Sequence, residues 1–287
     1  MSFSHLQQSI ERHFAAGSAA VGDEAAMADF FELRNALEAG QIRSAEPDDS
    51  TATGWRVNAW VKQGILLGFR IGVLMDFPSP EVPNPGLTYV DKSTFPARRI
   101  TASDGIRLLP GGSSIRAGAF VAAGVVCVAP MYINTGSYVD TGTMVDSHAL
   151  VGSCAQIGKR VHLSAAAQIG GVLEPINASP VVIEDDVLVG GNCGVYEGAI
   201  VRKRAVLAPG TILTRGTPVF DLVKGEVLRA TVEMPLIIPE DAVVVPGSRA
   251  VTKGKGLEWG LSLYAPVIVK YRDEKTDLST TLEELLR

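Results

Sequence analysis

The sequence predicts a mainly β protein built around a parallel β-helix of six-residue repeats, and three observations support this fold class. From Ile115 to Ile169 an aliphatic or small apolar residue recurs at every sixth position. The fourth residue after each of these is small or apolar in most repeats. The residue directly after each is often Gly, Asp, Asn, Ser or Ala, which are residues that tight turns favour.

A period of six fits neither the 3.6-residue helix nor an alternating amphipathic strand. It fits a triangular prism in which each hexapeptide forms one flat face and one corner, so that three hexapeptides close one coil. The recurring apolar residue, here called position zero, then points into the prism, and the small fourth residue fits the crowded corner. About six coils stacked ~4.8 Å apart are expected. The nineteen predicted position-zero residues are Ile115, Val121, Cys127, Ile133, Val139, Val145, Val151, Ile157, Leu163, Ile169, Ile183, Val189, Val195, Val201, Leu207, Leu213, Val219, Ile238 and Val244.

Two segments break the phase of the repeat. The first, 171–182, inserts eight residues, and the second, 220–237, inserts thirteen. Each is either a plain surface loop or an excursion that carries binding, since excursions from a rigid solenoid often do so. An excursion of this kind could lean over the groove of a neighbouring subunit.

The pattern divides the chain into three parts. Residues 1–107 are predicted to form an N-terminal α-rich domain, with helical spacing over 5–40, Gly40 able to end the second helix, and a strand followed by a helix in 53–72. Residues 108–252 form the β-helix. Residues 253–287 form a C-terminal cap, with an aliphatic strand at 263–269 and a short helix at 279–287. Both ends of an open solenoid need such caps, because its last coils expose strand edges and core.

Composition excludes several classes of function. The chain of 287 residues carries a formal charge of −5, which argues against nucleic acid or an anionic membrane as partner. It has no run of about 18 apolar residues and no apolar signal core near its start, so a cytoplasmic protein is expected. Three scattered cysteines suit neither a disulfide framework nor a zinc site.

Few residues of the coils suggest chemistry by type alone. The two coil histidines, His148 and His162, lie fourteen residues apart without a third, so no metal site is expected. Asp146 stands at position one of its hexapeptide, where it either hydrogen-bonds turn amides or acts on a ligand at the corner. Arg107 is either a surface cation or a fork that binds a substrate carboxylate through two hydrogen bonds.

The run YVDTGTMVDSHALVGSCAQIGKRVHLSAAAQIGGVLEP (138–175) closely resembles the tetrahydrodipicolinate N-succinyltransferase family of the lysine and diaminopimelate pathway. The likeness extends to IRAGAF (115–120), VNAWVKQGILLGFR (57–70) and LYAPVIVK (263–270). The resemblance implies left-handed coils and a homotrimer with active sites in grooves between subunits. It also implies transfer of succinyl from succinyl-CoA, a co-substrate, to the amine of the small-molecule acceptor tetrahydrodipicolinate. No permanently bound cofactor and no metal are expected.

The resemblance also assigns roles to residues. Asp146 is the matching substrate ligand and general base, Arg107 would hold one acceptor carboxylate, and His162 is the alternative proton acceptor. A base makes chemical sense because an alkyl amine with a pKa near 10 is only ~0.1% neutral at pH 7, and a positioned base contributes about 10²–10⁴-fold. Further substrate contacts are expected from residues of the same run, namely Ser153, Ser164 and Glu174.

Coenzyme A would use the later coils. Its pantetheine arm is expected along small residues such as Gly190 and Ala208, with phosphates near Lys253, Lys255 or the cations of 202–204. The alternative is that these cations form an ordinary solvated face. A coil backbone N–H is expected to stabilise the charge that develops on the thioester oxygen.

One position departs from the family pattern. In VGGNCGVYEG (189–198) the resemblance places a glutamate, as second catalytic acid, where this chain has Gly194. A mechanism with two carboxylates is therefore in doubt. Two alternatives stay open: an acetyl-CoA-dependent N- or O-acyltransferase, and a β-helical trimer that binds ligands without catalysis.

Overall fold

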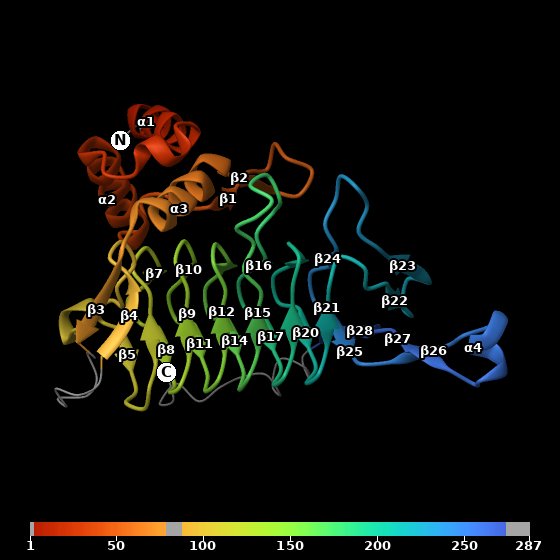
Figure 1. Cartoon of the computed structure of the whole chain (residues 1–287). Helices are drawn as coiled ribbons and strands as arrows, with labels where there is room; N and C mark the ends of the chain where they lie inside the picture. Colours follow the sequence, from red (N-terminus) through yellow and green to blue (C-terminus); the bar gives the residue numbers. More distant parts are fainter. Residues whose placement is uncertain (1–2, 79–87, 274–287) are drawn as a thin grey trace.

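The computed structural model describes residues 3–78 and 88–273. Figure 1 shows a long coil, with the N-terminal helices packed beside its first turns and a C-terminal arm that projects from its far end. Residues 279–287, for which a final helix was predicted, lie outside the described residues.

Three α-helices form most of the N-terminal part: α1 (Ser4–Ala15), α2 (Glu24–Glu38) and α3 (Ala59–Ile71). The predicted helices within 5–40 and the strand and helix within 53–72 are confirmed. Glycines set the close approach of α3 to α2, because a Cβ at Gly64 would lie 2.1 Å from Leu33 Cδ2 and one at Gly68 would lie 2.1 Å from the Phe30 ring. The smaller elements are η1 (Gly17–Ala20), β1 (Ala45–Pro47), β2 (Trp55–Val57), β3 (Leu74–Pro78), β4 (Thr88–Lys92) and η2 (Ala102–Asp104).

The coil is a parallel β-helix with three sheets, here called the first, second and third faces. The first face stacks β7 (Phe120–Val121), β10 (Tyr138–Val139), β13 (Gln156–Ile157), β16 (Val182–Ile183), β19 (Ile200–Val201) and β24 (Ile237–Ile238). The second stacks β5 (Arg107–Leu108), β8 (Val126–Cys127), β11 (Met144–Val145), β14 (His162–Leu163), β17 (Leu188–Val189), β20 (Val206–Leu207) and β25 (Ala242–Val245). The third stacks β6 (Ser114–Ile115), β9 (Tyr132–Ile133), β12 (Leu150–Val151), β15 (Gln168–Ile169), β18 (Gly194–Val195) and β21 (Ile212–Leu213).

The predicted hexapeptide phase is confirmed over most of the coil. Residues paired on neighbouring coils are eighteen apart, as are Val139 and Ile157, so three hexapeptides close one turn. Every predicted position-zero residue is buried, the most exposed being Val121 at 5%. Each buried aliphatic rung contributes about 1.5–3 kcal/mol, so this ladder supplies most of the hydrophobic core. The first excursion is also confirmed, because Ile157 pairs with Ile183, twenty-six residues on, which leaves eight extra residues.

The predicted position of the second excursion is wrong. Val201 pairs with Ile238, thirty-seven residues on, so the excursion begins after Leu213 and adds nineteen residues rather than thirteen. Val219 is buried, but it belongs to β22 (Val219–Asp221), which pairs with β23 (Glu226–Leu228) and with β28. Its side chain packs in the same hydrophobic core as the coil rungs, although its strand pairs beyond the last coil and is not part of the hexapeptide ladder.

The predicted C-terminal strand at 263–269 is two strands. β27 (Ser262–Tyr264) pairs with β26 (Ser248–Ala250), and β28 (Val267–Tyr271) pairs antiparallel with β25 beyond the last coil. The division falls at Pro266, which has no N–H to donate to a strand partner. A short helix that was not predicted, α4 (Gly254–Glu258), lies at the tip of the arm (Figure 1).

The first excursion is held against the N-terminal part by a buried lysine. Lys62 of α3 is fully buried, and its Nζ donates a 2.5 Å hydrogen bond to the carbonyl of Ala178. Burial lowers the pKa of this amine. Leu173, at the start of the same excursion, packs against the helical core. These contacts fix a long loop that has no regular secondary structure of its own.

Replacing Lys62 tests this anchoring. The change Lys62→Met keeps the apolar stem but leaves the Ala178 carbonyl without its donor. Amide hydrogen exchange over 171–182 should then become about tenfold faster, as the loss of one buried hydrogen bond predicts. Mass spectrometry of the exchanged protein measures the rate, and the exposed coil lysine Lys159→Met is the control. Unchanged exchange over 171–182 in Lys62→Met would show that the lysine does not hold the loop.

Candidate functional site

The structure brings together two of the predicted catalytic side chains. Asp146 follows β11, and His162 opens β14, the next strand on the second face, where it pairs with Met144. The two side chains meet outside the prism, with His162 Nε2 3.9 Å from Asp146 Oδ2. That distance is too long for a hydrogen bond.

The two oxygens of Asp146 have different surroundings. Oδ1 accepts a 2.7 Å hydrogen bond from the N–H of Ser147, which is the turn-forming role that the sequence left open. Oδ2 faces His162. Asp146 retains 30% exposure, so a ligand can reach it, whereas His162 is 17% exposed and both of its ring nitrogens are buried. The arrangement leaves the Asp146 carboxylate partly exposed, with the buried ring nitrogens of His162 beside its Oδ2.

Further predicted residues continue the same edge of the prism, where the second face turns into the third. This edge is called the Asp146 edge. Ser164, Gly190 and Ala208 follow β14, β17 and β20 in turn, and each donates its backbone N–H to the next coil. They therefore form a column of small side chains that rises ~4.8 Å per coil from Asp146.

Two backbone amides on the Asp146 edge are available to a ligand. The N–H groups of Ala165 and Gly191 stand one residue further into the turns and donate to none of the described residues. Ala165 is exposed, and Gly191 lies next to it on the following coil, with its Cβ position 3.3 Å from the Ala165 carbonyl oxygen. These are the coil N–H donors that a developing oxyanion at this edge would meet.

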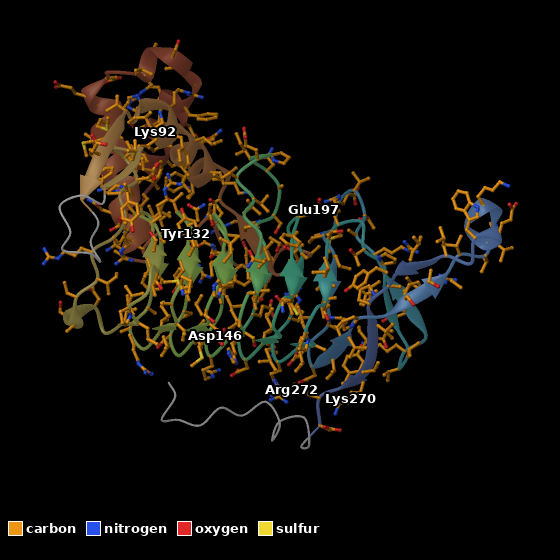
Figure 2. All side chains as sticks on the ribbon, turned by 60° about the horizontal axis from the view of Figure 1, so that its bottom comes forward. Lys92, Tyr132, Asp146, Glu197, Lys270 and Arg272 are labelled. Atoms are coloured by element: carbon orange, nitrogen blue, oxygen red, sulfur yellow. The ribbon has the colours of Figure 1, made fainter. Side chains whose placement is uncertain are left out.

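Ser153 and Glu174 lie elsewhere, where the third face turns into the first. This edge is called the Glu174 edge. Ser153 is buried in the turn after β12, and its carbonyl accepts from Val172 of the first excursion. Glu174 is exposed and lines a cavity of about 810 Å³, which also contacts Tyr196, Glu197 and Arg215. Figure 2 shows Asp146 and Glu197 at different edges, so one chain presents two separate groups of candidate residues.

Arg107 belongs to the coil itself, although the predicted boundary at 107/108 assigned it to the N-terminal part, just before the first coil. Arg107 and Leu108 form β5, which pairs in parallel with β8 on the second face. Arg107 therefore starts the column that continues through Val126 and Met144 to His162. Three strand spacings, ~14 Å, separate Arg107 from His162 along this column. The arginine is exposed on the same face as the Asp146–His162 pair, although it does not touch it.

The predicted coenzyme A residues are not gathered in one chain. Gly190 and Ala208 lie on the Asp146 edge, whereas Lys253 and Lys255 lie on the C-terminal arm with α4 (Figure 1). Lys255 Nζ forms a 2.6 Å ion pair with Glu258. The cations of 202–204 are also engaged: Arg202 with Glu184, and Arg204 with Asp241.

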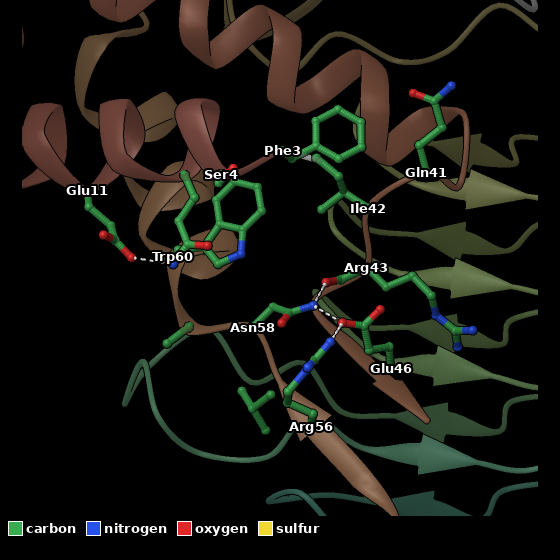
Figure 3. Close-up of a pocket in the computed structure, with 13 residues that line it drawn as sticks. Phe3, Ser4, Glu11, Gln41, Ile42, Arg43, Glu46, Arg56, Asn58 and Trp60 are labelled. Carbon is green, nitrogen blue, oxygen red and sulfur yellow. Dashed lines mark hydrogen bonds and ion pairs between the residues drawn. The ribbon is translucent and has the colours of Figure 1, made fainter. Parts of the chain in front are cut away.

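A separate cavity of about 710 Å³ lies in the N-terminal part and contains none of the predicted site residues (Figure 3). Its polar groups largely satisfy one another. Arg56 pairs with Glu46, and Asn58 Nδ2 donates to the Arg43 carbonyl and to Glu46.

Two absences apply to the described part of the chain. Residues 3–78 and 88–273 contain no cluster of three or more His, Cys, Asp or Glu side chains arranged to hold a metal ion. None of the helices in these ranges has the length and apolar character needed to cross a bilayer.

The three cysteines are buried and unpaired, and burial raises the pKa of Cys127 to about 12 and that of Cys154 to about 11.

Sequence reasoning did not single out Tyr196 or Arg215, which line the cavity beside Glu174. Tyr196 had a recognisable signal, because it puts an aromatic ring at position one, where most other repeats of the coil have small or turn-forming residues and none has an aromatic one. Arg215 was missed because the second excursion was predicted to begin after it.

Comparison with known proteins identifies the family. A family model described as tetrahydrodipicolinate N-succinyltransferase N-terminal matches residues 5–71, and one described as hexapeptide repeat of succinyl-transferase matches 180–215. Proteins named 2,3,4,5-tetrahydropyridine-2,6-dicarboxylate N-succinyltransferase align with this chain. Those from Afipia carboxidovorans and Rhodopseudomonas palustris (strain BisB5) are 41% and 43% identical, each over 100% of both chains. The one from Polynucleobacter asymbioticus is 40% identical over 99% of both.

A solved structure from Campylobacter jejuni superimposes with a TM-score of 0.48 at 17% identity. The alignment covers 82% of this chain and 61% of that one, so the assignment depends on the full-length sequence relatives. At 40–43% identity over essentially the entire length, the chain belongs to the tetrahydrodipicolinate N-succinyltransferase family.

Proposed function

We propose that this protein transfers the succinyl group of succinyl-CoA to the amine of tetrahydrodipicolinate in its ring-opened form, L-2-amino-6-oxopimelate. This reaction is a step of lysine and diaminopimelate biosynthesis. The observation that carries the proposal is the full-length identity to succinyltransferases, in a chain that places Asp146 beside His162 at an open edge of the coil. In the reaction the amine nitrogen attacks the thioester carbonyl, the new C–N bond forms, and the C–S bond breaks to release coenzyme A.

Asp146 is the proposed base at the nucleophilic nitrogen. The turn hydrogen bond occupies Oδ1 and leaves Oδ2 free, so Oδ2 can accept a proton from the acceptor amine. His162, 3.9 Å away, is the alternative proton acceptor and also limits the direction in which Oδ2 can bind. Arg107, on the same face, is the proposed partner of an acceptor carboxylate.

The acyl donor is proposed to lie along the Asp146 edge. Small side chains at Ser164, Gly190 and Ala208 leave room for the pantetheine arm of succinyl-CoA. The free N–H groups of Ala165 and Gly191 are the proposed donors to the thioester oxygen. Lys253 and Lys255 would reach the coenzyme A phosphates only from a neighbouring copy or after movement of the arm.

The assembly is proposed to be a homotrimer of left-handed coils, with each active site between two copies. One chain separates Asp146 from Ser153 and Glu174 by a whole face, so a single site needs the edge of a second copy. Identical prisms with flat faces favour a closed ring. The division of the chain at 107/108 and 252/253 belongs to the same proposal, with Arg107 itself moved from the N-terminal part into the coil. The cytoplasm, where succinyl-CoA is available, is the proposed location.

An assay of thiol release tests the activity. The purified protein should release coenzyme A from succinyl-CoA only when tetrahydrodipicolinate is present, and kcat/KM should be higher with succinyl-CoA than with acetyl-CoA. A preference for acetyl-CoA would indicate an acetyltransferase. No thiol release from folded protein with either donor would favour a non-catalytic β-helix.

Removing the charge of Asp146 tests its role. Asp146→Asn keeps the shape of the side chain but removes the base, so kcat/KM should fall about 10²–10⁴-fold. Asp140→Asn is the matched control, because Asp140 also stands at position one and accepts a 2.7 Å hydrogen bond from the next N–H, but at a different edge. If Asp146→Asn is as active as Asp140→Asn, Asp146 is not the base. His162 would then be the proposed proton acceptor.

A further inference from the structure

The Tyr196 ring occupies the space above two glycines on the third face. A Cβ placed on Gly194 would lie 2.4 Å from Tyr196 Cε2 and 2.8 Å from its hydroxyl oxygen. A Cβ placed on Gly170, one coil away, would lie 2.7 Å from Tyr196 Cδ1. Contacts this short exclude a side chain at either position while the ring stays in place. Gly194 and Tyr196 therefore form one structural unit, in which the ring of one residue fills the volume that the other leaves empty.

Tyr196 and Gly170 form part of the wall of the 810 Å³ cavity at the Glu174 edge, and Gly194 lies against the Tyr196 ring. Some polar groups there are already engaged: Glu197 Oε2 accepts from the Arg215 N–H at 2.8 Å, and the Arg215 guanidinium donates to the Val232 carbonyl at 2.9 Å. The Tyr196 hydroxyl and the Glu174 carboxylate form no hydrogen bond with any described residue. Two residues of the cavity lining therefore carry polar groups that no described residue uses, a phenolic donor and a carboxylate acceptor.

The charges of the cavity suit a ligand that carries both an ammonium or amine group and a carboxylate. Glu174 offers an anionic partner for the nitrogen. The Tyr196 hydroxyl, with the guanidinium of Arg215 in the same wall, offers donors for a carboxylate. The ring is confined by Gly170 and Gly194, so its hydroxyl is held in place and little side-chain entropy is lost on binding.

We propose that Tyr196 is an acceptor-binding residue whose hydroxyl donates a hydrogen bond to a carboxylate of the acceptor, while Glu174 faces the amine end. This inference rests on the proposed function, because it names a contact of the same acceptor. It also explains why position 194 is glycine, because any side chain there would collide with the Tyr196 ring.

Removal of the hydroxyl alone is the test. Tyr196→Phe keeps the ring that fills the space above Gly194, so the fold should be unchanged. KM for tetrahydrodipicolinate should rise about tenfold, with KM for succinyl-CoA unchanged, as the loss of a hydrogen bond to a charged group predicts. Calorimetric binding of tetrahydrodipicolinate alone should weaken by the same factor. The control is Tyr138→Phe, which removes a hydroxyl from a tyrosine stacked on Phe120 on the first face.

A double-mutant cycle tests the link to Gly194. Gly194→Ala should displace the ring and raise KM for the acceptor, and it should have little further effect in the Tyr196→Phe background. If the double variant raised the acceptor KM by the product of the two single effects, Gly194 and Tyr196 would act independently and the proposed unit would be overturned. An active parent whose acceptor KM and acceptor affinity are unchanged by Tyr196→Phe would overturn the acceptor contact. A parent without succinyl transfer would instead refute the proposed function, whereas the binding measurement does not depend on turnover.

Discussion

The stacking of rungs eighteen residues apart is the constraint on which the rest of this structure depends. Parallel backbone hydrogen bonds join each two-residue strand to the next coil, and the position-zero side chains fill the prism behind them. Because this register is rigid, the place of a side chain follows from its position in the hexapeptide. Asp146 and His162 meet for this reason: Met144 pairs with His162, and Asp146 stands two residues after Met144.

Much of the fold could be predicted because the repeat is a local signal that one sequence displays. The phase from Ile115 to Leu213 and the eight-residue first excursion followed from it, and the N-terminal helices followed from their own helical spacing. Val219 was assigned to the wrong strand, because a residue that fills the end of the coil core from a strand pair beyond the last coil shows the same apolar signal as a rung. The place of Arg107 was missed for the opposite reason, since β5 pairs out of phase with the repeat, nineteen residues before Val126.

Single residues of the candidate site could be predicted from the sequence, but the contacts between them could not. Resemblance picked out Asp146 and His162, and the register explains their contact. The relation between Gly194 and Tyr196 could not be read from the sequence, because it depends on how an aromatic ring folds back over its own strand and the coil beside it. The glycine that departs from the family pattern is thus accounted for by packing, and its neighbour supplies a polar group to the same cavity.

The candidate residues lie on two separate edges of the prism, the Asp146 edge and the Glu174 edge. The central claim is that each active site is formed by the Asp146 edge of one copy and the Glu174 edge of its neighbour. Mixing Asp146→Asn chains with Glu174→Gln chains, unfolded and refolded together, tests this claim most directly through the rate of succinyl transfer. Each variant alone should be strongly impaired. If a site combines the Asp146 edge of one copy with the Glu174 edge of another, about one quarter of the sites in an equal mixture are intact and that share of the parental activity returns. A mixture no more active than its separate components would contradict the account, because a site contained in one chain leaves no intact site in either variant.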